Sequence, residues 1–276
     1  MEPDHRSGAY CHPQRGLILG VVIITSGLAL LAQAAIPTVL PEGQVLKDAR
    51  LDPLTGTYSG FFPFEPPTSK TQWAQRSERL RTQLRVALGL WPLPERTALN
   101  PVIHGRVERD THTVERVYFE SYPGFYVTGS LYRPRDKAGR MPGVLCPHGH
   151  WTNGRFMTRT QKELDRELVQ GAERFDPGGK SPLQSRCVQL ARMGCVVFHF
   201  DMIGYADSQQ IPSSIAHRFK AQRPEMNTAE NWGLYSARAE SHGQTVMGLQ
   251  TWNAIRARDF ISALPDVDTG RLAVTG

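Results

Sequence analysis

The sequence predicts an α/β fold, in which a mostly parallel sheet is preceded along the chain by an antiparallel hairpin. Between residues 102 and 133, apolar and polar residues alternate, as in strands that bury one face. From residue 143 onwards, short apolar runs alternate with longer segments of helical period. This alternation of strand and helix, with short turns between them, is typical of a parallel sheet with crossover helices.

The first 34 residues have the features of an export signal. Arg6 and Arg15 precede an apolar run over residues 17–32, and a small-x-small cleavage pattern ends at Ala34. A membrane anchor is the alternative, but the run is shorter than the roughly 20 apolar residues that a span needs. We therefore expect a signal peptide over residues 1–34 and a secreted or periplasmic protein, with no stable membrane span after cleavage.

Residues 35–100 are expected to form an arm followed by a helix. Residues 35–68 are rich in Pro, Gly and Thr, which favours irregular structure. From residue 70 to residue 91 apolar residues recur at helical spacing, and Pro92 ends the pattern. The main domain is then expected over residues 101–276.

The alternating segments predict the hairpin and its neighbours. Residues 114–121 and 125–133 both alternate, and residues 122–124 (Tyr-Pro-Gly) form the expected turn between them. Residues 102–108 can supply another strand. A continuous apolar run over residues 143–146 follows, which is typical of a strand buried on both faces.

Two helix–strand units complete the predicted domain. A helix is expected to begin at Ser181, whose hydroxyl would cap it, and to end at Gly194 before a strand over residues 195–200. A second helix over residues 244–264 leads through a turn to a last buried-type strand over residues 271–276.

Three short motifs stand at the carboxyl ends of the predicted strands. His148-Gly149-His150 follows the first buried strand, and residues 201–208 follow the second with the pattern Asp-x-x-Gly-x-Ala-x-Ser. The third strand ends at Gly276. Ligands of open α/β sheets bind at the carboxyl ends of the strands, so we expect the first and third motifs to be neighbours there.

Taken in this order, the motifs resemble those of the α/β-hydrolases, in particular the acetylxylan-esterase-like branch. The resemblance covers most of the chain after about residue 73, and its blocks are residues 147–151, 200–208 and 266–276. It implies a serine-type carboxylic ester hydrolase with a Ser-His-Asp triad, acting on a small-molecule or carbohydrate ester such as an acetylated sugar. One departure is Ala206, which stands where these proteins usually have a second glycine.

The resemblance also implies roles for residues at the strand ends. The backbone N–H of His150, directly after Gly149, is the expected donor to the oxyanion of the reaction intermediate. His148, Asp201 and Gly204 are expected to hold the turns beside this site.

Gly276 resembles the first residue of a nucleophile elbow, Gly-x-Ser-x-Gly. No complete copy of that pattern occurs in the 276 residues. The serine is therefore expected two positions after Gly276, and the acid and the base beyond it. By this reading the chain is an incomplete, C-terminally truncated α/β-hydrolase with no catalytic residue of its own, and whether it is itself an enzyme stays open.

Alternatives remain at the level of function and of single residues. A dienelactone-hydrolase-like or peptidase-like α/β-hydrolase fits the same motifs, and a non-catalytic binding protein fits the missing nucleophile. His148 and His150 match a His-x-His zinc pattern, but no further ligand follows nearby, so no metal or cofactor is expected. Two long insertions, residues 152–180 and 209–243, interrupt the sheet. Trp151, directly before the first, and Trp232, in the second, would either stack on substrate or anchor the surface.

Charge and cysteine content bear on partners. The net charge is +6, but acidic residues interleave with the basic ones and no basic stripe forms, so nucleic acid is not an expected partner. Cys146, Cys187 and Cys195 have no framework spacing, and the fold is not expected to depend on disulfides. A Cys187–Cys195 bond is the one pairing left open.

Overall fold

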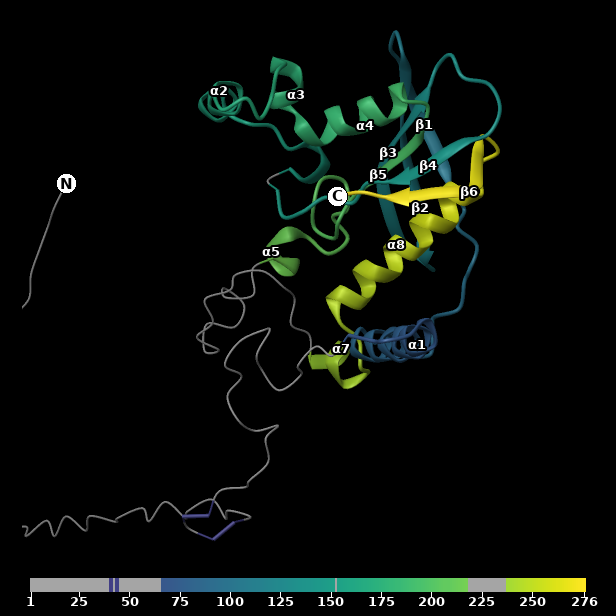
Figure 1. The fold of residues 1–276 in the computed structure, drawn as a ribbon, viewed down its shortest axis with the longest axis vertical. Coiled ribbons are helices and arrows are strands. Elements are labelled where there is room, and N and C mark those ends of the chain that lie inside the picture. The colour runs from purple at the N-terminus through teal and green to yellow at the C-terminus, as the bar shows by residue number, and fades with distance from the viewer. Residues whose placement is uncertain (1–39, 42, 45–65, 152, 218–236) are drawn as a thin grey trace, which may run out of the picture. The chain divides into compact units, whose positions relative to one another are not determined.

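The computed structural model describes residues 40–41, 43–44, 66–151, 153–217 and 237–276 (Figure 1). The chain divides into two compact units, Met1–Pro66 and Pro67–Gly276, and every described helix and strand belongs to the second. The predicted signal peptide and most of the predicted arm lie outside the described residues. Among the helices that are described, none has the length and apolarity needed to cross a membrane.

A six-stranded mixed sheet forms the centre of the second unit, in the order β1-β2-β3-β5-β4-β6. The strands are β1 (Val102–Glu108), β2 (His112–Tyr122), β3 (Phe125–Pro134), β4 (Met141–Leu145), β5 (Val196–Phe200) and β6 (Val267–Val274). β4 runs parallel to both β5 and β6, and these three strands carry the motifs. β1, β2 and β3 pair antiparallel, and β3 joins β5 antiparallel. The predicted α/β class and the antiparallel hairpin ahead of the parallel strands are both confirmed.

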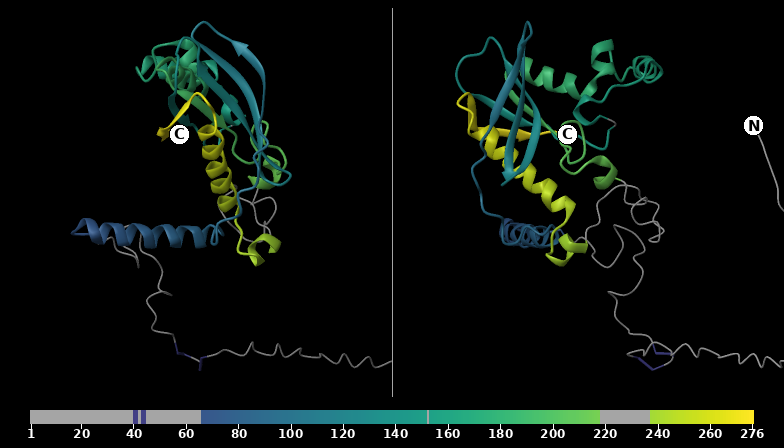
Figure 2. Two further views of the ribbon diagram at one scale, coloured as in Figure 1. Left: turned by 90° about the vertical axis from the view of Figure 1, so that its right-hand side faces the viewer. Right: turned by 180° about the vertical axis from the view of Figure 1, so that it is seen from behind.

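The described helices lie around this sheet, and only some of them pack on its faces (Figures 1 and 2). They are α1 (Lys70–Ala87), α2 (Gln161–Val169), α3 (Asp176–Lys180), α4 (Pro182–Arg192), α5 (Ser213–Ala216), α7 (Ala237–Ser241) and α8 (Val246–Ser262), with a short 3-10 turn, η1 (Gly154–Phe156). The first turn of α8 is stabilised by Thr245, whose hydroxyl accepts a hydrogen bond of 2.9 Å from the backbone N–H of Gly248.

The two longest amphipathic segments after the hairpin cover opposite faces of the sheet. On one face, the Phe260 ring of α8 lies 5.2 Å from the ring of Phe119 on β2 and 4.9 Å from that of Phe198 on β5. On the other face, Cys187 and Ala191 of α4 pack against side chains of β3, β4 and β5. Each fully buried side chain of this kind contributes about 1.5–3 kcal/mol, so the central strands are fixed from both sides.

Helix α1 is shorter than predicted and buries none of its residues. It ends at Ala87 rather than near Trp91, because Gly89 takes a left-handed conformation (φ 69°) and the N–H of Leu90 turns back to the carbonyl of Arg85. Although apolar residues recur along it at helical spacing, 56% of Trp73 is exposed.

The prediction that the Ser181 hydroxyl caps α4 is wrong. Ser181 is at once the residue after α3 and the residue before α4, and its own N–H bonds back to the carbonyl of Pro177. This shared position gives it φ −130° and ψ 66°, and its side chain makes no capping hydrogen bond. The Cys187–Cys195 pairing is also absent, since all three described cysteines are free thiols and Cys187 lies in the α4 core beside Cys146.

Strand β6 begins earlier than predicted, at Val267 instead of residue 271. Val267 already pairs with Met141, and the register then shifts so that Leu272 pairs with Gly143. The intervening residues form a bulge. β6 was also expected to be buried, yet 69% of Val274 is exposed, because no strand of the described chain pairs with the outer edge of β6.

Candidate active site

The carboxyl ends of β5, β4 and β6 lie at one edge of the sheet, since the three strands are parallel neighbours. His148-Gly149-His150 follows β4, and Gly276 follows β6. Gly276 lies beside the residue that precedes the first segment: a Cβ atom placed on Gly276 would lie 3.0 Å from the carbonyl oxygen of Pro147. The expectation that these two strand ends are neighbours is therefore confirmed.

His148 fixes the turn after β4 through both of its ring nitrogens. Its Nε2 lies 3.1 Å from the backbone N of Met202, and its Nδ1 lies 2.8 Å from the carbonyl oxygen of Gly149. Because the Met202 N–H can only donate, Nε2 must accept, and the proton sits on Nδ1 and is donated to Gly149. Burial lowers the pKa of His148, which favours this neutral form. With both nitrogens engaged, His148 in this arrangement has none left for a zinc ion.

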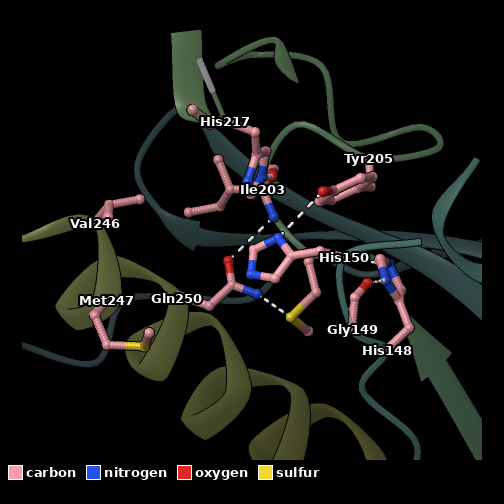
Figure 3. A pocket seen from close by; sticks show the side chains of 11 residues that line it. His148, Gly149, His150, Ile203, Tyr205, His217, Val246, Met247 and Gln250 are labelled. Carbon is pink, nitrogen blue, oxygen red and sulfur yellow. Dashed lines mark hydrogen bonds between the residues drawn. The ribbon is translucent and has the colours of Figure 1, made fainter. Parts of the chain in front are cut away.

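His150 belongs to a cluster of aromatic rings at the mouth of the site (Figure 3). Its Nδ1 lies 3.1 Å from the hydroxyl of Tyr205. The ring of His217 lies 4.9 Å from that of His150 and 4.5 Å from that of Tyr205. His217 is itself held by a 2.7 Å hydrogen bond from Nε2 to the carbonyl of Ile203, and burial lowers its pKa. His217 was not predicted as a site residue, because it lies 67 positions from His150 in a stretch with no motif.

A cavity of about 200 Å³ opens beside this cluster. It is lined by the 148–150 turn, by residues after β5 and α5, and by the first turns of α8: His148, Gly149, His150, Met202, Ile203, Tyr205, Ala216, His217, Val246, Met247 and Gln250. None of these side chains is an acid, a lysine or an arginine. Figure 3 shows Val246 and Met247 on the α8 side of the cavity and the three histidines opposite. Such a lining suits a neutral group rather than an ion.

The turn after β5 is tied down by Asp201. One of its oxygens, Oδ2, accepts from the hydroxyl of Thr128 at 2.7 Å and from the backbone N–H of Asp207 at 3.2 Å. Further along, the N–H of Gly204 bonds to the carbonyl of Ser208 at 2.9 Å. Gly204 has φ 82°, and a Cβ atom there would lie 3.0 Å from the backbone of Ser213. This position therefore favours glycine for both its conformation and its space.

Comparison with known proteins was made by sequence and by structure. No protein-family model and no curated protein sequence matches the chain. Among solved structures, the methylesterase BT1017 is 25% identical over 76% of this chain, with a TM-score of 0.52. A candidate acetyl xylan esterase from Bacteroides fragilis is 13% identical over 76% of the chain, with a TM-score of 0.53.

This chain has the α/β-hydrolase fold. It spans 37% of the length of the methylesterase and 49% of that of the Bacteroides fragilis protein.

The remaining predicted site residues of this α/β-hydrolase take different positions. Gly149 and His150 are exposed at the edge of the cavity, as a donor to a bound group requires. Trp151 is 46% exposed and does not line the cavity. Trp232 lies outside the described residues. Among the residues that are described, no group of three or more His, Cys, Asp or Glu side chains could hold a metal ion.

Arg155 is a residue near this candidate site that the sequence analysis did not single out. It comes from η1, in the insertion after β4, yet it is only 1% exposed. Its guanidinium reaches Ser130, Asp201 and Asp207. An arginine in a charged, irregular insertion reads as a surface residue, and only the tertiary structure shows the carboxylates that it meets.

Proposed function

We propose that this chain supplies the oxyanion-binding part of a serine-type carboxylic ester hydrolase. The observation that supports it most directly is that Gly276 lies beside Pro147, the residue before the 148–150 turn, because β4 and β6 are neighbouring parallel strands. In this proposal Gly276 opens the nucleophile elbow, and the serine stands two residues later, facing the turn.

The proposed role of this chain is to stabilise negative charge. When a serine Oγ attacks an ester carbonyl, the carbonyl oxygen becomes an oxyanion, and in this proposal the backbone N–H of His150 after Gly149 donates to it. The neutral His148 holds this turn through the Gly149 carbonyl and the Met202 N–H. A donor fixed in advance in this way needs no rearrangement during the reaction, and its loss in such enzymes costs about 10²–10³ in kcat.

The proposed substrate is an ester of a carbohydrate. Support comes from the cavity beside the turn, whose lining has no acid, lysine or arginine and suits a neutral ester, and from the two similar structures, a methylesterase and a candidate acetyl xylan esterase. Rings such as those of Tyr205 and His150 at the rim also suit the apolar face of a sugar. The predicted export signal agrees with a polysaccharide substrate outside the cell.

The test begins with the coding DNA after codon 276. We expect an open frame that continues with x-Ser-x-Gly. The protein made from the whole frame should hydrolyse p-nitrophenyl acetate and release acid from acetylated or methyl-esterified polysaccharide. A serine-directed phosphonate, or alanine at the new serine, should abolish turnover.

The 276-residue chain is the matched control, and it should show no turnover above a heat-killed sample. Turnover by the 276-residue chain that the phosphonate abolishes would show a nucleophile elsewhere and overturn the assignment. A frame with no serine at the proposed position would instead favour the non-catalytic binding protein.

A further inference from the structure

The Arg155 guanidinium joins three parts of the fold around the end of β5. Its Nε donates to the hydroxyl of Ser130 on β3 at 3.0 Å, and its Nη2 donates to Oδ2 of Asp207 at 2.5 Å. Its Nη1 donates to Oδ2 of Asp201. The plane of the guanidinium also stacks over the ring of Phe156, 4.2 Å from its centre. Arg155 therefore has a partner for each of its nitrogens despite being almost fully buried.

The other oxygen of the Asp201 carboxyl faces His148. Oδ1 lies 3.9 Å from Nε2 of His148, both side chains are fully buried, and the structure gives Oδ1 no hydrogen-bond partner. A buried carboxylate at this distance attracts a proton onto the neighbouring imidazole. The Nε2 atom does not carry one, because it accepts the N–H of Met202. Burial of His148 opposes this pull first of all, and the Arg155 cation on the other oxygen of Asp201 adds to the opposition.

We propose that Arg155 is a positioning residue, which neutralises Asp201 so that His148 stays uncharged and keeps accepting the Met202 N–H. If the cation were absent, Asp201 would draw a proton onto Nε2 of His148. A protonated Nε2 cannot accept a hydrogen bond, so the link between the 148–150 turn and the residue after β5 would break. Only the consequence of this inference for catalysis rests on the proposed function. The protonation state of His148 itself can be measured without any substrate.

Burial of His148 acts in the same direction as Arg155, whereas the hydrogen bond from its Nδ1 to the Gly149 carbonyl acts in the opposite direction. The ring of His199, on β5, lies 6.0 Å away in an edge-to-face contact, and that of Tyr205 lies 5.5 Å away. Positive charge on His150 or His217 would also oppose a proton on His148. Among the described residues, Asp201 is the acidic group in direct reach of the His148 ring. The protonation state of His148 therefore depends on how well Asp201 is neutralised.

The experiment is a pH titration of the 276-residue chain labelled with ¹⁵N-histidine, followed by NMR. In the unaltered chain His148 should show the neutral form with the proton on Nδ1 and a midpoint below the usual histidine value. In Arg155→Met the midpoint should rise above the usual value, and hydrogen exchange of the Met202 amide should become about tenfold faster. Arg155→Lys keeps the charge and should leave His148 neutral at pH 7.

Two further variants separate charge from simple loss of packing. Adding Asp201→Asn to Arg155→Met removes the unpaired carboxylate and should return the His148 midpoint below its usual value. Arg159→Met is the matched control, because Arg159 also lies in the insertion but bonds to Gly179 and Glu167 instead. It should leave His148 unchanged.

The inference is overturned if Arg155→Met folds and His148 titrates as before. If Arg155→Met does not fold, the double variant and Arg155→Lys decide: a charged His148 at pH 7 in either of them would overturn it, and a neutral one in both supports it. None of these readouts uses ester hydrolysis, so a failure here is distinct from a failure of the proposed function.

Discussion

His199 is a histidine kept uncharged by its surroundings. It is fully buried on β5, and neither ring nitrogen has a hydrogen-bond partner in the structure. Burial above all, with help from the nearby His148, Arg186 and Arg155, lowers the pKa of His199 to about 3. An unfolded chain would bind the proton near pH 6.5, so acid favours the unfolded state between those two values.

We expect His199→Leu to remove part of this acid sensitivity. At pH 7.5 His199 is neutral in both the folded and the unfolded chain. The variant should then be as stable as the unaltered chain or slightly more stable, because the substitution removes a buried polar ring that has no hydrogen-bond partner. Between pH 6.5 and pH 5, protonation of His199 in the unfolded state should lower the free energy of unfolding of the unaltered chain by about 2 kcal/mol. The variant lacks this histidine and should not show that decrease. Denaturant unfolding at pH 7.5 and pH 5.0 measures this difference, and equal losses in both proteins would contradict the assignment.

Ala206 has a backbone conformation that glycine adopts more readily. Its φ is 45°, in the left-handed region, within the turn that follows Asp201. A non-glycine residue there costs about 1–2 kcal/mol. We expect Ala206→Gly to raise the free energy of unfolding by about 1 kcal/mol. Ala254→Gly, in the regular helix α8, is the control and should lower it by a similar amount. Loss of stability in both variants would show that the Ala206 turn is not strained.

At this scale the sequence predicted residues that belong to a motif and missed those that do not. His148 was expected to fix the turn, and it does so through hydrogen bonds to its own loop and to Met202. Arg155 and His217 were missed, because their partners come from strands and turns far away along the chain. A motif records local geometry, whereas a buried ion pair depends on the packing of separate elements.

Helix α8 and the end of α1 approach each other so closely that only glycine fits between them. A Cβ atom on Gly248 would lie 1.8 Å from the carbonyl oxygen of Leu88, and one on Gly89 would lie 1.9 Å from that of Gly243. The hydroxyl of Thr245 also donates to the Leu88 carbonyl at 3.3 Å. The start of α8, which lines the cavity through Val246, is therefore held against the turn after α1.

Gly248→Ala tests this contact. In an ordinary helix the change stabilises by roughly 0.5–1 kcal/mol, because glycine loses more backbone entropy on folding. Here we expect the opposite sign, with a loss of about 1–3 kcal/mol from overpacking. Ser262→Ala, at the exposed far end of α8, is the control and should be close to neutral. A stabilised Gly248→Ala variant, judged by thermal melting, would show that α1 does not rest on α8.

The sequence predicted the elements better than their ends. Alternation and apolar runs located all six strands, since the residues that form a face repeat at a fixed period. The end of α1, the missing cap at Ser181 and the early start of β6 were not predicted. Each depends on a local feature of the backbone. The end of α1 depends on the left-handed conformation of Gly89, the missing cap on the position of Ser181 between two helices, and the start of β6 on a bulge after Val267.

At the scale of the whole molecule, the exposed edge of β6 is the feature of the 276-residue chain that most favours self-association. Its backbone groups on that side pair with no described strand, and Val274 is 69% exposed. Such an edge can pair with another chain. We expect Val274→Lys to reduce self-association, measured by light scattering and by binding of a hydrophobic dye. Val169→Lys, on α2 and 87% exposed, is the control and should change little. Equal association in both variants would exclude the edge as its cause.

The place of β4 between β5 and β6 also bears on the order of events during synthesis. Both neighbours come later in the chain, and Met141 pairs with Val267, which is made roughly 120 residues afterwards. At about 5–20 residues per second, a ribosome takes on the order of 6–25 s to cover that stretch. Throughout this time the nascent β4 lacks its second partner. The strand that leads into the His148 turn is thus enclosed last, and the site forms only once the whole described chain has been synthesised.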